Sequence, residues 1–593
     1  MLETDVLIVG SGPAGSSAAL MCSSYGLNNM IVTKHNWLAN SPRAHYQNQR
    51  TMEIMRDLYI ADEVIAKASP KEVMGNVVFC TSLAGEELGR LPYGANQPRR
   101  HSDYALASPC EHCDLPQHLL EPILLTNAAS RGSHARFDTE YLGHVQDADG
   151  VTVEVKDRLT KTTYHIRAKY LLGADGSNSK VAEDLQLPME GDMGLAGSIS
   201  IILRADLSKY IAHRPGYLWW VLQPGCNIGG IGMGLLRMVR PWSEWQIVWG
   251  YNIQEGAPEL TVEDGKQIAR QLIGDDHIPI DIRSISNWTV NQKYATLYSR
   301  GRVFCLGDAV HRHPPSNGLG SNSSIQDAYN LIWKIALVLK GTASPSLLET
   351  YNSERAPVGK QIVKRANKSI GEFGAIFDAL GVSGTLDATE MQANMAELKS
   401  ATVEGATRRE KLRQAISFKS YEFATQGVEM NQRYQSAAII SESTEPVWQR
   451  DPELYYQPST LPGGRLPHVW LNQNGSEISS LDLVGKGAFT LLTGISGEAW
   501  KEATADAEAK FGISIKAHII GPGRDVQDLY GDWAEIRDIP EAGCILVRPD
   551  GHVAWRSRSC EMPQEQLEQI MSKLLGLSKR GNKSKSQLEE ALA

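Results

Sequence analysis

Residues 301–334, GRVFCLGDAVHRHPPSNGLGSNSSIQDAYNLIWK, decide the fold. An apolar strand over 303–306 is predicted to end at Gly307-Asp308, and a helix is predicted to open near Ser323. A strand that ends this way leaves the carboxylate of Asp308 at its C-terminal edge, where it can accept hydrogen bonds from a polyol. The following helix start offers unpaired backbone N–H groups and a partial positive charge.

A cofactor with a ribityl chain, and with a ring that becomes anionic on reduction, would use both features. The stretch therefore predicts FAD. Between strand and helix, Pro314 and Pro315 are expected to fix the loop over the flavin ring, which makes Pro315 a candidate catalytic residue as well as a cofactor contact. The predicted cofactor contacts of this stretch are Gly307, Asp308, Pro315, Gly318, Gly320, Ser321 and Asn322.

The N-terminus predicts the other half of the cofactor site. A buried strand over 5–9 leads into Gly10-Ser11-Gly12-Pro13-Ala14-Gly15 and then into a helix. In such a turn the first glycine allows the tight bend, the second lets the backbone approach a pyrophosphate, and the third lets helix and strand pack closely. At the end of the next strand, Thr33 or one of its neighbours stands where an acid usually holds the ribose. The later glycines Gly230, Gly232 and Gly234 have the wrong spacing for a second fingerprint and are interpreted as backbone packing in a strand.

Two further segments complete the pattern. A strand from Tyr170 ends in an Asp-Gly turn at Asp175, and a basic loop from Arg43 to Arg50 leads into a helix. With these residues the chain resembles the single-component FAD-dependent aromatic hydroxylases, the group of para-hydroxybenzoate hydroxylase and phenol 2-monooxygenase. Within that group it is most similar to chlorophenol hydroxylases of the 2,4-dichlorophenol 6-monooxygenase type. The segments that carry this second resemblance are WLANSPRAHYQNQRTMEI at 37–54, IGGIGMGL at 228–235, VRPWSEW at 239–245 and HRHPPSNGLGSN at 311–322.

The resemblance implies an α/β fold with two main parts. One is a Rossmann-type, glutathione-reductase-like FAD-binding domain with an inserted antiparallel substrate sheet, and the other is a C-terminal thioredoxin-like α/β domain. In the latter, strands are predicted at 489–493 and 515–520, a helix at 498–511, and a hairpin at 544–555. Because no C-x-x-C lies in it, a structural or dimerising role is expected. The expected order is FAD-binding domain 1–185 and 291–370, substrate sheet 186–290, helical segment 371–458, thioredoxin-like domain 459–578 and polar tail 579–593.

The chemistry that the resemblance implies is hydroxylation of a phenol, ortho to its oxygen, through a flavin hydroperoxide. Dioxygen and a transient NADPH or NADH are the expected co-substrates. Gln117 matches the family position that touches the polar edge of the flavin. Asp175 is a candidate contact to FAD or nicotinamide, with an Asp-capped turn as the alternative.

His45 lies where the phenol hydroxylases carry an aspartate that takes the phenolic proton. A histidine with a pKa near ~6.5 would suit that task at neutral pH. The alternative is a loop histidine hydrogen-bonded to backbone. Arg43 is the neighbouring candidate for holding the substrate or the flavin.

Three other functions compete with hydroxylation. A flavin-dependent halogenase would carry W-x-W-x-I-P, whereas Trp242-Ser243-Glu244-Trp245-Gln246-Ile247 has different spacing and no proline after the isoleucine. A flavin oxidase or dehydrogenase acting on an aromatic or polyketide substrate would need only the FAD-binding residues. A thioredoxin-type scaffold would leave the FAD residues unexplained.

Length, charge and cysteine content limit the number of domains and the partners that the protein is expected to have. With 593 residues the chain is expected to hold two to four domains. A net charge of −9 without a basic block argues against nucleic acid as a partner. No signal peptide and no ~18-residue apolar run is recognised, which favours a cytoplasmic protein without a membrane span. Cys110 and Cys113 form a C-x-x-C without a second ligand pair, so no metal is expected. A homodimer or a higher homo-oligomer is expected.

Overall fold

The computed structural model describes residues 2–224, 233–383, 387–442 and 447–577. The chain divides into two compact units. The first comprises Met1–Tyr329, Arg355–Asn431 and Trp448–Gln457, and the second comprises Asn330–Glu354, Gln432–Val447 and Pro458–Ala593. The helices α9 (Gly320–Leu339) and α10 (Thr350–Gly371) each run from one unit into the other along the chain.

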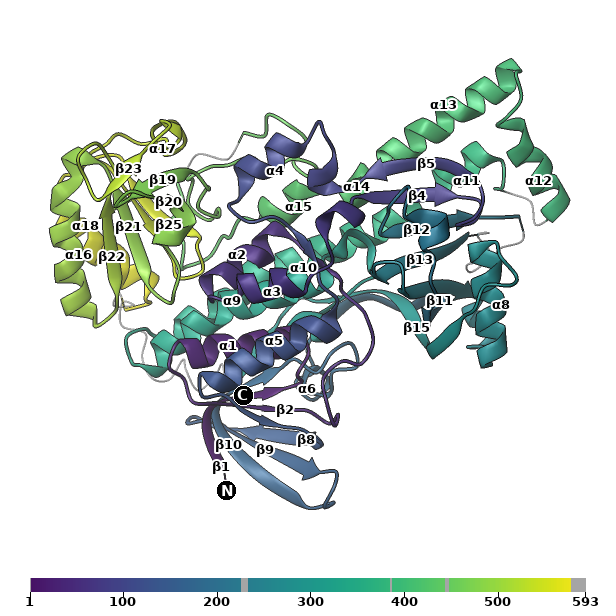
Figure 1. Cartoon of the computed structure of the whole chain (residues 1–593). Helices are drawn as coiled ribbons and strands as arrows, with labels where there is room; N and C mark the ends of the chain where they lie inside the picture. The colour runs from purple at the N-terminus through teal and green to yellow at the C-terminus, as the bar shows by residue number, and fades with distance from the viewer. Residues whose placement is uncertain (1, 225–232, 384–386, 443–446, 578–593) are drawn as a thin grey trace. The chain divides into compact units, whose positions relative to one another are not determined.

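The first unit begins with a largely parallel sheet, in the order β16-β17-β10-β1-β2-β7, with β9 and β8 added antiparallel beside β10. Helices α1 (Pro13–Ser24) and α5 (Gln117–Ser130) lie side by side on it (Figure 1). Because helices cover such a sheet, the C-terminal half of its central strand β1 is apolar, and Val6, Leu7 and Ile8 are completely buried. The strands are β1 (Leu2–Val9), β2 (Asn29–Val32), β7 (His134–Arg136), β8 (Thr139–Gln146), β9 (Val151–Asp157), β10 (Thr163–Gly173), β16 (Ser299–Arg300) and β17 (Val303–Cys305).

The strand and the helix predicted within 301–334 are confirmed as β17 and α9, with one difference. Helix α9 begins at Gly320 rather than near Ser323. Glycine, serine and asparagine have low helix propensity, so the run Gly320-Ser321-Asn322 hides the true start in the sequence.

The second sheet of this unit has the order β18-β15-β11-β14-β13-β12-β4-β5. The expected antiparallel substrate sheet is present as β11, β12, β13, β14 and β15, and strands from outside 186–290 extend it. The hairpin β4–β5 joins from residues 76–92, and β4 pairs with β12 in parallel. The apolar residues of β4 are fully buried and belong to the core of this sheet. The strands are β4 (Asn76–Cys80), β5 (Glu87–Pro92), β11 (Met189–Arg204), β12 (Leu218–Leu222), β13 (Met233–Arg240), β14 (Glu244–Tyr251), β15 (Asp281–Ala295) and β18 (His311–Arg312).

Helix α8 (Val262–Ile273) packs on one face of this sheet. A Cβ added at Gly234 in β13 would lie 2.5 Å from Cδ2 of Leu272 in α8, so the packing interpretation of this glycine is confirmed. Gly230 and Gly232 lie outside the described residues. Trp219, Leu236 and Trp245 are fully buried, which places the core of this sheet beneath α8.

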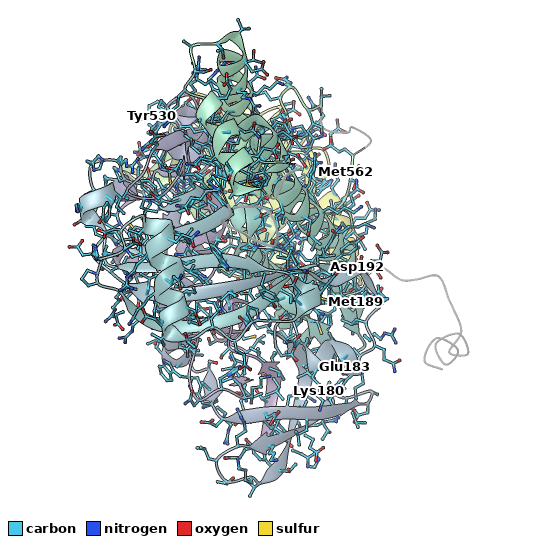
Figure 2. The ribbon with its side chains drawn as sticks, turned by 90° about the vertical axis from the view of Figure 1, so that its right-hand side faces the viewer. Lys180, Glu183, Met189, Asp192, Tyr530 and Met562 are labelled. Atoms are coloured by element: carbon cyan, nitrogen blue, oxygen red, sulfur yellow. The ribbon has the colours of Figure 1, made fainter. Side chains whose placement is uncertain are left out.

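The chain passes from the first sheet to the second through the short helix α6 (Lys180–Asp184) and the start of β11. Figure 2 labels Lys180 and Glu183 of α6 below Met189 and Asp192 of β11. The region predicted to be helical after 370 follows the sheets. Its helices are α11 (Gly374–Leu380), α12 (Ala388–Glu397), α13 (Val403–Phe418), α14 (Ser420–Phe423) and α15 (Gln426–Met430).

The second unit holds the predicted thioredoxin-like elements. The parallel strands β21 (Phe489–Thr493) and β22 (Ile515–Ile519) are joined by α16 (Glu498–Phe511). The antiparallel strands β24 (Cys544–Val547) and β25 (Val553–Ser557) follow, and α18 (Pro563–Leu574) packs on α16. The predicted strands, helix and hairpin are confirmed, while the domain boundaries stay predictions. The expected tail 579–593 lies outside the described residues. In the described ranges, no helix combines the length and the apolar character that crossing a bilayer requires.

Candidate active site

The carboxyl ends of three parallel neighbours bring the predicted cofactor residues together. β1 pairs with β10, and β10 pairs with β17, all in parallel. The Gly10–Gly15 turn, Asp175 and Gly307-Asp308 follow these three strands directly. Ligands of open α/β sheets bind at this edge.

The three glycines of the first turn differ in the space that the protein leaves around them. Gly10 has a φ of +104°, and a Cβ there would lie 2.2 Å from the carbonyl oxygen of Ala174. At Gly15 a Cβ would lie 1.9 Å from the oxygen of Gly10. At Gly12 it would meet only Oε1 of Glu121, at 3.9 Å. Gly10 and Gly15 are therefore required by the protein itself, whereas Gly12 leaves open space beside the start of α1, which Pro13 and Ala14 form.

The loop that carries Asp308 packs closely against both α1 and α9. Gly307 has a φ of +64°, and a Cβ there would lie 2.7 Å from Oγ of Ser324 in α9 and 3.2 Å from Cβ of Ala14 in α1. Asp308 itself is exposed, and no group of the described residues donates a hydrogen bond to its carboxylate. It is thus an acceptor left for a ligand.

In the first turn of α9, Ser321 has a polar atom without a hydrogen-bond partner among the described residues, whereas the side chain of Asn322 is fully hydrogen-bonded. Oγ of Ser321 is buried and lacks a hydrogen-bond partner among the described residues. Asn322 instead donates from Nδ2 to the carbonyls of Tyr46 (2.8 Å) and Gly318 (2.6 Å), and its Oδ1 accepts from Asn48 N–H. The side chain of Asn322 therefore holds the loop of Tyr46 and Asn48 against the start of α9. Only its backbone N–H is left to contact a cofactor.

Gln117 is the first residue of α5, and it contacts Glu121, a carboxylate that no sequence motif indicated. Its Nε2 donates to Oε1 of Glu121 at 2.5 Å, and Oε2 of Glu121 accepts from the N–H of Ala39 at 2.7 Å. Burial raises the pKa of Glu121, although Arg43 acts in the opposite direction. Arg43 is exposed, and its carbonyl accepts from the N–H of Gln117. Of these side chains, Glu121 borders the open space at Gly12, where its Oε1 would lie 3.9 Å from an added Cβ.

The side chains of Asp175 and Thr33 accept hydrogen bonds from other groups of the protein. The Asp175 carboxylate accepts from Ser179 Oγ and from the N–H groups of Lys180 and Val181, so it caps α6. This geometry favours the capped-turn alternative for Asp175. Thr33 is buried at the end of β2, and its Oγ1 accepts from the N–H of His35 at 3.4 Å. Pro315, at the start of the turn before α9, is exposed.

These observations fit FAD. The space at Gly12 and the first turn of α1 suit a pyrophosphate. The unpartnered carboxylate of Asp308 suits a ribityl hydroxyl, and the start of α9 with the unpartnered Ser321 suits the polar edge of the flavin.

His45 lies beside the start of α9, because its neighbour Tyr46 is hydrogen-bonded to Asn322. The ring is 2% exposed, and Nδ1 lies 3.3 Å from Oδ1 of Asp114. Nε2 is buried without a partner among the described residues. The structural alternative, a histidine hydrogen-bonded to backbone, does not describe this geometry.

The pKa expected for His45 from the sequence is wrong. Burial lowers it to about 4, Arg237 lowers it as well, and Asp114 acts in the opposite direction. Burial would raise the pKa of Asp114, but His45 and Arg237 hold it below its usual value. At neutral pH the ring is therefore neutral and the carboxylate ionised.

Two comparisons of the sequence with family models match most of the chain. Residues 3–366 match the FAD binding domain, and residues 459–577 match the C-terminal domain of aromatic-ring hydroxylases. The chain belongs to the FAD-dependent aromatic-ring hydroxylases. FAD is its cofactor, and it is a flavoprotein monooxygenase.

The similarity to individual members extends over nearly the whole length. The chain is 53% identical to 2,4-dichlorophenol 6-monooxygenase of Delftia acidovorans, covering 94% of this chain and 95% of the relative. It is 50% identical to phenol 2-monooxygenase of Pseudomonas sp. (strain EST1001), covering 94% and 90%. Among solved structures, the flavin-dependent monooxygenase PieE in complex with FAD and substrate superimposes with a TM-score of 0.92 at 42% identity, covering 97% and 99%. These relatives favour hydroxylation over the oxidase, halogenase and scaffold alternatives.

Proposed function

We propose that this protein hydroxylates a phenol at a carbon ortho to the phenolic oxygen, with dioxygen and NADPH or NADH as co-substrates. The observation that carries the substrate class is the near-full-length similarity to two phenol hydroxylases, each named for attack beside the phenolic oxygen. When bound and reduced by the nicotinamide, FAD would activate dioxygen, so that one oxygen atom enters the phenol and the other leaves as water.

The residues of this chain contribute binding and proton transfer. Gly12, the first turn of α1 and Asp308 hold the cofactor, and the start of α9 with Ser321 stabilises negative charge on its ring, by about 0.3–2 kcal/mol. His45 accepts the phenolic proton at Nε2. Removal of that proton matters because electrophilic oxygen transfer leaves positive charge on the ring, which a phenolate disperses better than a phenol. Arg43, which is exposed, and Pro315 complete the proposed site from the surrounding loops.

The test is oxygen incorporation. Purified holoenzyme is given phenol, 2,4-dichlorophenol or benzoate under ¹⁸O₂, with NADH and NADPH in parallel. The phenols are expected to stimulate nicotinamide oxidation and to give catechols with one ¹⁸O atom, whereas benzoate stimulates little. Nicotinamide oxidation that yields only hydrogen peroxide with every phenol would overturn the proposal.

We further propose a cytoplasmic location and a homodimer or higher homo-oligomer, as expected from the sequence. Light scattering on the purified holoenzyme should give at least twice the mass of one chain. A mass equal to one chain across the micromolar range would contradict the oligomer.

A further inference from the structure

Asp114 joins two residues that are far apart in the sequence. It lies in the short strand β6 (Cys113–Asp114), which pairs with β3 (Tyr46–Gln47) directly after His45. One carboxylate oxygen meets Nδ1 of His45 at 3.3 Å, and the other accepts from Nη2 of Arg237 in β13 at 2.9 Å. The Asp114 side chain is 9% exposed, so both contacts are screened from water.

Taken with the proposed phenol hydroxylation, on which the idea rests, this geometry points to a role for Asp114. We propose that Asp114, held by Arg237, positions His45 so that Nδ1 carries the ring proton and Nε2 keeps its lone pair for the phenolic proton. Asp114 is a positioning residue, because it acts through His45.

The tautomer follows from the hydrogen-bonding capacity of each group. An ionised carboxylate only accepts, so a neutral imidazole next to it donates from Nδ1–H. The remaining nitrogen then has to be the acceptor, and Nε2 is the buried atom without a partner among the described residues. Without Asp114, nothing in this contact set would prevent the ring from carrying its proton on Nε2, where it could not accept another.

Asp114 also favours the product of the transfer. When the phenol O–H bond breaks and the Nε2–H bond forms, the ring becomes an imidazolium beside the carboxylate while the substrate becomes a phenolate. Of the charged groups that act on His45, Arg237 and His118 disfavour the imidazolium and Asp114 favours it. The pKa of about 4 already includes this favourable effect of Asp114, so loss of Asp114 would lower the pKa of His45 further and make Nε2 a weaker acceptor for the phenolic proton.

A purely structural role would also explain the contacts, since Asp114 links β6 to β13. The test therefore measures substrate ionisation and coupling as well as rate. The variants are Asp114→Asn, His45→Ala and the double variant, with Asp103→Asn as the matched control. Asp103 is an aspartate paired with Arg100 at 2.8 Å and with Arg450 at 2.7 Å, and it does not contact His45.

We expect Asp114→Asn to retain FAD and nicotinamide-dependent reduction but to hydroxylate phenol at pH 7 at least ~10-fold more slowly. The rate should recover as the pH approaches the pKa of phenol. 4-Nitrophenol, ionised at pH 8, should be nearly unaffected, and the double variant should be no slower than His45→Ala.

Equal loss with phenol and with ionised 4-nitrophenol would overturn the positioning role, as would a further loss when Asp114→Asn is added to His45→Ala. Normal turnover of phenol by His45→Ala would instead remove His45 as the base. Absence of catechol from the wild-type enzyme would remove the proposed function itself.

Discussion

The backbone N–H of Gly307 donates to Oδ2 of Asp327 at 3.0 Å, so the loop that presents Asp308 is tied to the interior of α9. Asp327 is completely buried, and it also accepts from His311 at 2.9 Å and from Nε of Arg355 at 2.7 Å. Burial would raise the pKa of Asp327, but Arg355 and His311 hold it below its usual value. The ligand position at Asp308 therefore depends on an ion pair in the core.

Replacing Asp327 by Asn should destabilise the protein. The Arg355 guanidinium, 1% exposed, would lose its counter-charge, which typically costs about 3–5 kcal/mol. The measurement is the midpoint of unfolding, followed together with FAD content. Asp184→Asn, which alters an exposed carboxylate that accepts from Tyr141, is the control. Unchanged stability and FAD content would show that the hydrogen bond between Gly307 and Asp327 is not needed to hold the loop.

The glycines of the first turn should separate folding from cofactor binding. Gly12→Ala adds a Cβ where the protein leaves space, so the apoprotein should keep its stability and lose FAD affinity. Gly15→Ala adds a Cβ 1.9 Å from the oxygen of Gly10 and should impair folding itself. Thermal unfolding and FAD titration of the two apoproteins check this. Full FAD affinity in Gly12→Ala would contradict the proposed pyrophosphate position.

Asp308→Ala should fold and bind FAD more weakly. A charge-assisted hydrogen bond to a ribityl hydroxyl is worth about 1.5–3 kcal/mol, which corresponds to roughly 10–150-fold in affinity. The Kd for FAD is measured by flavin fluorescence, with the exposed Asp62→Ala as the control. A fully yellow Asp308→Ala protein after extensive dialysis would refute the assignment.

In the second unit, Glu354 should stabilise the fold in a pH-dependent manner. It is fully buried and bonded to Lys334 at 2.7 Å and to Arg548 at 2.6 Å. Burial would raise its pKa, but Arg548 and Lys334 hold that pKa well below the usual range. Because the folded pKa is depressed, the contribution is present above the unfolded value of about 4.3 and is lost as the pH falls below it.

Glu354→Gln should therefore cost about 3–5 kcal/mol near pH 7, and the difference from wild type should shrink below about pH 4. Chemical unfolding at several pH values measures this difference. Glu410→Gln, in an exposed pair with Arg413, is the control and should change little. A difference that grows on acidification would contradict the sign.

The sequence predicts secondary structure correctly where the pattern lies within a short segment. The strand–turn–helix at Gly10–Gly15 and the α16–β22 unit follow from short-range patterns. The dyad of His45 and Asp114 did not, because its members are 69 residues apart and only the pairing of β3 with β6 joins them. Burial is equally invisible in sequence, which is why the pKa of His45 was placed too high. The parallel pairing of β4 with β12 could not be predicted either, because the two strands are far apart in the sequence.

The most direct test of the account is the hydroxylation rate of His45→Ala with phenol at pH 7. We predict that this variant binds FAD and is reduced by the nicotinamide, while catechol formation falls ~10²–10⁴-fold, the range expected of a positioned base. The rate should recover as the pH approaches the pKa of phenol itself. Catechol formation at the wild-type rate at pH 7 would show that another group removes the phenolic proton.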